Sequence, residues 1–170
     1  ASSWRCTMYP FAGNARSLLL AKREVAGAQL LLLDGDLVFD AAVITRLCSS
    51  SHPDCLALRR TENMTGEEMK IEADPDGRIR TVSKQVPVAR AAGESIGVEL
   101  FSAAGSERLF AALEDRVGRR GLVNEYYEAS FQELIDLGVP LYAVDVSGHY
   151  CTEIDTPEDL AAAERDLQAL

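Results

Sequence analysis

The segment Leu30-Leu31-Leu32-Leu33-Asp34-Gly35-Asp36-Leu37-Val38-Phe39-Asp40 is the best guide to the architecture of this chain. An apolar run that ends in acid is typical of a buried parallel strand, at the carboxyl end where open α/β sheets bind ligands. Side chains alternate along a strand, so Asp34 and Asp36 are expected to point the same way, while Gly35 permits a sharp turn. Two such carboxylates suit Mg²⁺, which takes part of its shell from substrate phosphates. In the alternative interpretation, these aspartates cap the next helix.

The composition predicts one folded domain spanning 1–170. Of its residues, 47% are hydrophobic and 26% charged, which is ordinary for a globular protein. The net charge is −10 and the 17 Lys and Arg residues are scattered, which argues against nucleic-acid binding. No apolar run is long enough to span a bilayer, and nothing resembles a signal peptide, so we expect no membrane association.

The cysteines favour a cytoplasmic protein. None of the four has the spacing of a metal site, and reduced thiols are the simpler interpretation. They are Cys6, Cys48, Cys55 and Cys151. The chain opens on residues 1–5 without an initiator Met or a helix or strand pattern, which we interpret as a cut end.

Helix and strand signals alternate along the chain, which predicts an α/β fold with a mixed sheet and an inserted hairpin. Asn14 is expected to cap a helix over 15–26 that Gly27 ends, and Ser102 to cap another. The turn Asp74-Pro75-Asp76-Gly77 predicts the hairpin. Further helices are expected at 40–48, 125–137 and after Thr156, and strands at 29–33, 55–58, 69–72, 78–84, 94–101 and 141–144.

A second acidic segment precedes the last helix. Glu153 and Asp155 alternate just before Thr156-Pro157, a strong helix start. If this segment lies beside Asp36, three or four carboxylates converge on one metal ion. The alternative is that Asp155 and Thr156 only cap the helix.

Other common sites are not indicated. The chain contains no G-x-G-x-x-G and no Gly-Lys pair, so dinucleotide and Walker-type phosphate sites are not expected. His52 and His149 have no serine or cysteine in a nucleophile setting, and we interpret them as a loop residue and a strand-end residue.

Together these motifs resemble the sugar-phosphate nucleotidyltransferase family, and most of all its phosphocholine cytidylyltransferase-like members. The resemblance rests on their order across almost the whole chain. In order, they are the Leu-Leu-Leu-Asp-Gly-Asp strand end, Val82-Ser83-Lys84, Glu94-Ser95-Ile96-Gly97, Asn124-Glu125-Tyr126-Tyr127-Glu128, and Glu153-Ile154-Asp155-Thr156-Pro157-Glu158-Asp159-Leu160.

The resemblance implies a GT-A-like, three-layer nucleotide-diphospho-sugar transferase fold. It also implies transfer of a nucleotidyl group, such as CMP from CTP, to a phosphorylated alcohol over Mg²⁺, with release of pyrophosphate. The acceptor would be phosphocholine, a phosphonate, or a sugar or polyol phosphate. Family members begin with a strand and a glycine-rich loop that holds the triphosphate. This chain lacks both, so we expect it to be the C-terminal part of the full domain.

The resemblance also assigns roles to residues. Asp36, Glu153 and Asp155 would bind the metal, and Lys84 would contact the acceptor's phosphate, consistent with catalysis by positioning and charge neutralisation. The remaining assignments are to substrate binding: Asn14, Ser17, Asp34, Glu94, Gly97, Glu125 and Tyr126. An acidic and aromatic lining would suit a cationic choline or amine group.

Two alternatives remain open. Asp34-Gly35-Asp36 also satisfies the D-x-D pattern of metal-dependent glycosyltransferases, although the segment 153–160 favours nucleotidyl transfer. The missing glycine-rich loop instead favours a non-catalytic domain of the same fold. The nucleotide base, the acceptor and the oligomeric state are left open.

Overall fold

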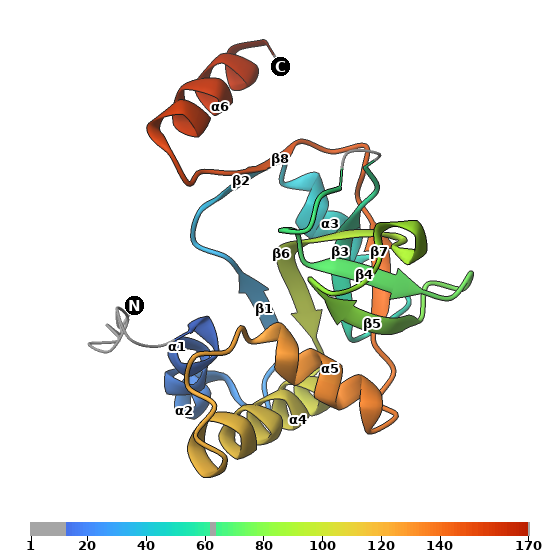
Figure 1. Cartoon of the computed structure of the whole chain (residues 1–170), viewed down its shortest axis with the longest axis vertical. Helices are drawn as coiled ribbons and strands as arrows, with labels where there is room; N and C mark the ends of the chain where they lie inside the picture. The colour runs from blue at the N-terminus through green and yellow to red at the C-terminus, as the bar shows by residue number, and fades with distance from the viewer. Residues whose placement is uncertain (1–12, 62–63, 170) are drawn as a thin grey trace.

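Strand β6 (Gly93–Phe101) lies at the centre of the computed structural model, which describes residues 13–61 and 64–169 (Figure 1). It belongs to a six-stranded mixed sheet in the order β5-β4-β6-β3-β7, with β1 paired to β6. The other strands of this sheet are β1 (Leu30–Leu33), β3 (Cys55–Arg59), β4 (Lys70–Ala73), β5 (Ile79–Ser83) and β7 (Tyr142–Asp145).

The remaining elements surround this sheet. Short strands β2 (Leu37–Phe39) and β8 (Cys151–Glu153) pair with each other. The α-helices are α1 (Asn14–Leu20), α2 (Lys22–Val25), α3 (Ala42–Cys48), α4 (Ala103–Leu113), α5 (Glu128–Asp136) and α6 (Pro157–Ala169). A π-helical segment, Glu114–Arg119, continues α4.

Two different strands share one edge of β6. Near its start β6 pairs with β4, in the register Lys70↔Glu94, and near its end it pairs with β1, in the register Leu33↔Val98. Along the opposite edge, β3 follows β6 with an irregularity between Leu56 and Leu58. The first edge of β6 thus changes its partner from β4 to β1 between Glu94 and Val98. An irregularity such as the one on the opposite edge is common beside functional sites.

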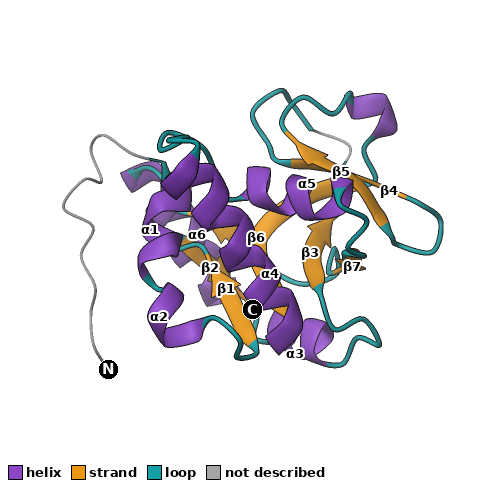
Figure 2. Ribbon diagram, turned by 90° about the horizontal axis from the view of Figure 1, so that it is seen from below, coloured by secondary structure: helices purple, strands orange, loops and turns teal. Residues whose placement is uncertain are grey.

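Helices cover both faces of the sheet. Alternate β6 residues Ile96, Val98 and Leu100 pack with Val43 and Leu47 of α3. The opposite face packs against α4 and α5, which lie side by side below the sheet in Figure 1 and near the viewer in Figure 2. These layers confirm the predicted three-layer α/β fold.

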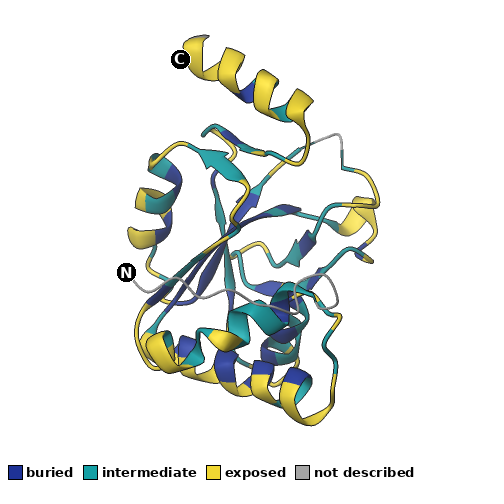
Figure 3. Cartoon of the chain, turned by 90° about the vertical axis from the view of Figure 1, so that its left-hand side faces the viewer, coloured by how far each residue is buried: buried dark blue, intermediate teal, exposed yellow. Residues whose placement is uncertain are grey.

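The last helix starts as the sequence predicts. The Asp159 N–H donates to Thr156 Oγ1 over 3.2 Å, and the Thr156 N–H donates to Asp159 Oδ2 over 2.8 Å. These reciprocal bonds form a capping box. Helix α6 projects from the body and is largely exposed, except at Ala163 (Figure 3).

Other elements with strong local signals also occur where they are predicted. β4 and β5 form the hairpin, and β3 and β7 are the strands expected at 55–58 and 141–144. Ser102 caps α4 by accepting a hydrogen bond from the Gly105 N–H over 3.0 Å.

Some expectations were wrong. β1 is antiparallel to β6 rather than parallel to a neighbour, and its burial decreases from Leu30 to Leu33, which is 39% exposed. Leu33 is exposed because β1 pairs with one strand only among the described residues.

Helix boundaries also differ. The helix expected at 15–26 is split at Ala21, and Gly13 rather than Asn14 is its N-cap, because the Asn14 amide is engaged with Tyr127. The helix expected from 125 starts at Glu128. Strands β2 and β8 were not expected.

Three further predictions concern the start of the chain, the cysteines and membrane-spanning segments. The cut end at 1–5 and Cys6 lie outside the described residues, while Cys48, Cys55 and Cys151 are free thiols. Among residues 13–61 and 64–169, no helix combines the length and apolar character that crossing a bilayer requires.

Candidate functional site

The acidic turn after β1 is fixed by backbone hydrogen bonds at both ends. The Asp34 N–H donates to the Gly97 carbonyl over 2.9 Å, and the Asp36 carbonyl accepts from the Ile154 N–H over 2.8 Å. The turn is thus attached to the central strand β6 and to the segment that follows β8. Residues far apart in the sequence meet here, as the β2–β8 pairing Leu37↔Glu153 requires.

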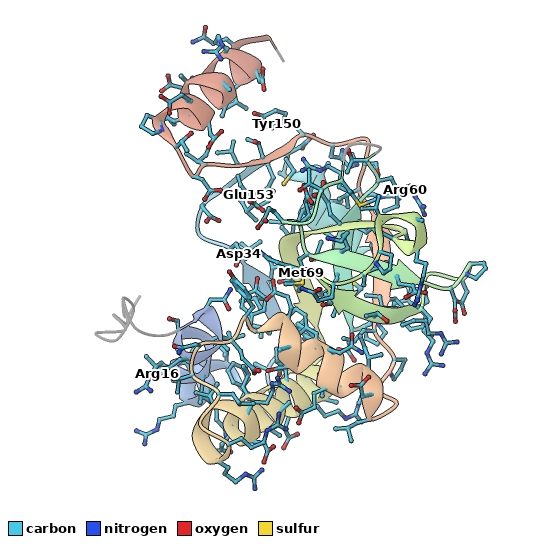
Figure 4. All side chains as sticks on the ribbon, in the orientation of Figure 1. Arg16, Asp34, Arg60, Met69, Tyr150 and Glu153 are labelled. Atoms are coloured by element: carbon cyan, nitrogen blue, oxygen red, sulfur yellow. The ribbon has the colours of Figure 1, made fainter. Side chains whose placement is uncertain are left out.

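A cavity of about 1110 Å³ opens at this turn. Figure 4 shows Asp34, Met69 and Glu153 around it. Nine of the residues that the sequence assigns to a site line this cavity: Asn14, Asp34, Asp36, Lys84, Glu94, Gly97, Tyr126, Glu153 and Asp155.

Two assigned residues lie elsewhere. Ser17 is not among the residues that line the cavity, and Glu125 lines a neighbouring groove instead. The Glu125 carboxylate pairs with the Arg116 guanidinium, 2.6 Å away. Its negative charge is therefore already compensated.

The cavity is strongly acidic. Its carboxylates are Asp34, Asp36, Glu67, Glu68, Glu94, Glu128, Glu153, Asp155 and Asp159. Among the described lining residues only Arg59 and Lys84 are basic, and Arg59 donates to Glu94 Oε1 and to the Cys151 carbonyl, each over 2.7 Å. Most of the negative charge is left without a cation, which favours binding of a positively charged group.

The metal-ligand candidates share this uncompensated charge. Burial raises the pKa of Glu153, and the nearby carboxylates of Asp155 and Asp36 raise it further. Among the described residues, no group of three or more His, Cys, Asp or Glu side chains is arranged to hold a metal ion. Mg²⁺ usually binds through one or two carboxylates plus substrate phosphates, so the donor set of Asp36 and Glu153 fits it chemically.

Lys84 supplies the available positive charge. Its ammonium nitrogen lies 5.1 Å from the centre of the Tyr126 ring and makes no ion pair with the described residues. Tyr126 is 54% exposed, so this ring does not hold Lys84 in a buried position. A cation at the end of β5 can therefore reach an anionic ligand in the cavity.

Two buried acids were missed by sequence reasoning. Glu99 is fully buried, with both oxygens unpartnered among the described residues, and burial raises its pKa well above the usual range. Burial likewise raises the pKa of Glu128 to about 7, and Glu128 lines the cavity. A carboxylate inside an apolar strand, as at Glu99, is the signal that could have identified this cluster.

Gly97 is required by the site's packing. Its φ is +68°, and a Cβ there would lie 2.4 Å from Asp34 Oδ2. We expect Gly97→Ala to lower the free energy of unfolding by about 2 kcal/mol, from backbone strain and overpacking. Urea denaturation measures this effect, and Gly148→Ala is the matched control, because nothing lies within 4 Å of the Cβ at that position. Equal stability of the two variants would contradict the prediction.

The chain is similar to known proteins in structure. No family model and no curated protein sequence matches the chain. The inositol-1-phosphate CTP transferase from T. maritima superposes with a TM-score of 0.72 at 19% identity, over 93% of this chain and 62% of that one. The CTP:phosphocholine cytidylyltransferase from Streptococcus pneumoniae gives a TM-score of 0.70 at 19% identity, over 95% and 67%.

A third similar structure is a nucleoside-diphosphate-sugar pyrophosphorylase from Vibrio cholerae RC9, with a TM-score of 0.60 at 16% identity, over 90% of this chain and 65% of that one. This chain thus spans about two thirds of the length of these proteins. The similarities confirm that the chain has the nucleotidyltransferase fold that the sequence resemblance implied.

Proposed function

We propose that this protein is a nucleotidyltransferase that transfers CMP from CTP to a phosphorylated small alcohol. The observation on which the proposal rests is the shared cavity, where Asp36, Glu153 and Asp155 lie with Lys84 and Tyr126. The acceptor would be phosphocholine, a phosphonate, or a sugar or polyol phosphate. Two proteins of the same fold are named for CTP and for phosphorylated alcohols, inositol-1-phosphate and phosphocholine, which supports this choice.

The proposed chemistry is a displacement at phosphorus. A phosphate oxygen of the acceptor forms a bond to the α-phosphorus of CTP, and the bond from that phosphorus to the pyrophosphate oxygen breaks. Mg²⁺, when bound, would neutralise charge on the triphosphate. Asp36 and Glu153, with Asp155 nearby, would hold it.

The other residues would position the acceptor. Lys84 would bind the acceptor's phosphate and orient the attacking oxygen, so no covalent enzyme intermediate is needed. Glu94 and Tyr126 would face the organic group, where a cationic head is favoured by the acidic lining. We place this activity in the cytoplasm, consistent with the free thiols.

The glycosyltransferase alternative is less well supported. The D-x-D pattern would use both Asp34 and Asp36, but Asp34 Oδ1 already accepts a hydrogen bond from the Tyr127 hydroxyl over 2.7 Å. Of the two aspartates in the described turn, only Asp36 has a carboxylate without a hydrogen bond to another side chain, so only Asp36 is free to bind a metal.

Pyrophosphate release tests the proposal. Purified protein is incubated with Mg²⁺ and CTP, UTP or GTP, each with and without phosphocholine. We expect release to require both a nucleotide and the acceptor, with CTP preferred. If phosphate acceptors other than phosphocholine are also inert, and no pyrophosphate forms either with this chain or with a longer one that carries the N-terminal strand and glycine-rich loop expected of the full domain, the domain is non-catalytic and the proposal is wrong.

Lys84→Ala is expected to raise the KM for the acceptor by about 10-fold or more, because a charge-assisted hydrogen bond to phosphate is lost. The KM for CTP should change less. Steady-state kinetics measures both. Lys22→Ala is the control, since Lys22 pairs with Glu114 away from the cavity. An unchanged KM for the acceptor would remove Lys84 from acceptor binding.

A further inference from the structure

The Tyr127 side chain links the start of α5 to the acidic turn. Tyr127 is only 3% exposed, and its ring packs against Phe131 with 5.3 Å between centroids. The hydroxyl is its one polar side-chain group, and it donates to Asp34 Oδ1 over 2.7 Å. A buried tyrosine hydroxyl normally needs a partner, and here the partner is the first carboxylate of the turn.

Asp34 is confined from the opposite side as well. Its Oδ2 lies where a side chain on Gly97 would be, so β6 approaches this carboxylate closely. The Asp34 N–H is bonded to the Gly97 carbonyl at the same place. Both the backbone and the carboxylate of Asp34 are therefore fixed, and rotation of this side chain would break the bond to Tyr127.

Tyr127 is itself fixed by α1. The Asn14 Oδ1 accepts a hydrogen bond from the Tyr127 N–H over 2.8 Å, although 113 positions separate the two residues. The backbone of Gly13 also contacts this segment, because its N–H donates to the Val123 carbonyl over 2.8 Å. The hydroxyl therefore reaches Asp34 from a backbone held at two points.

We propose that Tyr127 is a positioning residue, which fixes the Asp34–Asp36 turn through Asp34 and so places Asp36 for cation binding. Asn14 supports this role by holding the Tyr127 backbone, rather than by contacting substrate. Asp34 accordingly anchors the turn and is not a ligand of the metal. The inference rests on the proposed function of Asp36, two residues beyond the anchored carboxylate.

The test compares Tyr127→Phe with Tyr150→Phe. Both remove one tyrosine hydroxyl that donates to an aspartate, and the Tyr150 hydroxyl, 3.3 Å from Asp166, lies outside the cavity. Calorimetric titration with Mn²⁺ should show binding weakened about 10-fold in Tyr127→Phe, the usual effect of losing an outer-shell partner. Tyr150→Phe should bind Mn²⁺ as the wild type does.

Hydrogen exchange gives a readout independent of the metal. In Tyr127→Phe, amide exchange should accelerate at residues 34–37 and remain unchanged in β3 and β6. Unchanged exchange at residues 34–37 would overturn the positioning role. If the wild type binds no Mn²⁺ but the exchange result holds, the proposed metal function fails and the anchoring by Tyr127 stands.

Variants at Asp34 distinguish an anchor from a ligand. Asn at this position can still accept the Tyr127 hydrogen bond, so Asp34→Asn should weaken Mn²⁺ binding less than Asp34→Ala does. If Tyr127 and Asp34 act through one bond, Asp34→Ala combined with Tyr127→Phe should be no weaker than the weaker single variant. Equal losses in Asp34→Asn and Asp34→Ala would instead identify Asp34 as a ligand and overturn the proposal.

Discussion

Asp36→Asn is expected to reduce nucleotidyl transfer by about 100- to 1000-fold, the usual effect of removing one pre-positioned group that stabilises transition-state charge. Asn keeps the shape of the side chain but removes the charge that would hold the metal. Asp34, the other carboxylate of the turn, cannot take the place of Asp36 without breaking its own bond to the Tyr127 hydroxyl. Pyrophosphate release at saturating CTP and acceptor measures the loss.

Asp40→Asn is the matched control for this variant. Asp40 belongs to the same segment, but its carboxylate accepts a hydrogen bond from the Ala42 N–H over 2.8 Å and lies outside the cavity. Asn can also accept that bond, so activity should be retained. If Asp36→Asn and Asp40→Asn were equally active, Asp36 would have no role in metal binding or catalysis.

The β4–β5 hairpin shows how much of the fold was predictable from local sequence. Alternating strands and the turn Asp74-Pro75-Asp76-Gly77 require no distant partner, and Gly77 adopts the positive φ of +85° that such a turn favours. The caps at Ser102 and Thr156 are equally local, since each bond spans three residues. Such elements were predicted correctly for this reason.

Strand β1 shows what could not be predicted locally. Four leucines are typical of a strand buried on both faces, but burial depends on neighbours that lie more than 60 residues away in β6. The same holds for β2 and β8, which are three residues each and form only because they pair. Asn14 was misread because the partner of its amide, Tyr127, is remote in sequence.

The site followed the same pattern. The convergence of residues on one cavity was implied by the resemblance of motifs to a family, and their roles in metal and acceptor binding stay predictions. The buried acids Glu99 and Glu128 were missed because their environment is tertiary. Glu128 lies at the start of α5, where an acidic residue is ordinary for a helix N-terminus.

Glu128 should make stability depend on pH. Its side chain is buried, Oε2 has no hydrogen-bond partner among the described residues, and burial raises the pKa from 4.5 to about 7. Between these two pH values the native state holds a proton that the unfolded state has released. The free energy of unfolding should therefore fall by about 3 kcal/mol as the pH rises from 4.5 through 7, and the raised pKa of Glu99 acts in the same direction.

Glu128→Gln should reduce this dependence to the part that Glu99 contributes, because glutamine keeps the size of the side chain and cannot ionise. Urea denaturation between pH 5 and pH 8 measures the slope, and the variant should be more stable than the wild type at pH 8. Glu164→Gln is the control: Glu164 is exposed on α6, so its substitution should shift stability by less than about 0.5 kcal/mol and leave the slope unchanged. If Glu128→Gln kept the wild-type slope, the Glu128 carboxylate would be ionised in the native protein at neutral pH, contrary to the effect expected from its burial.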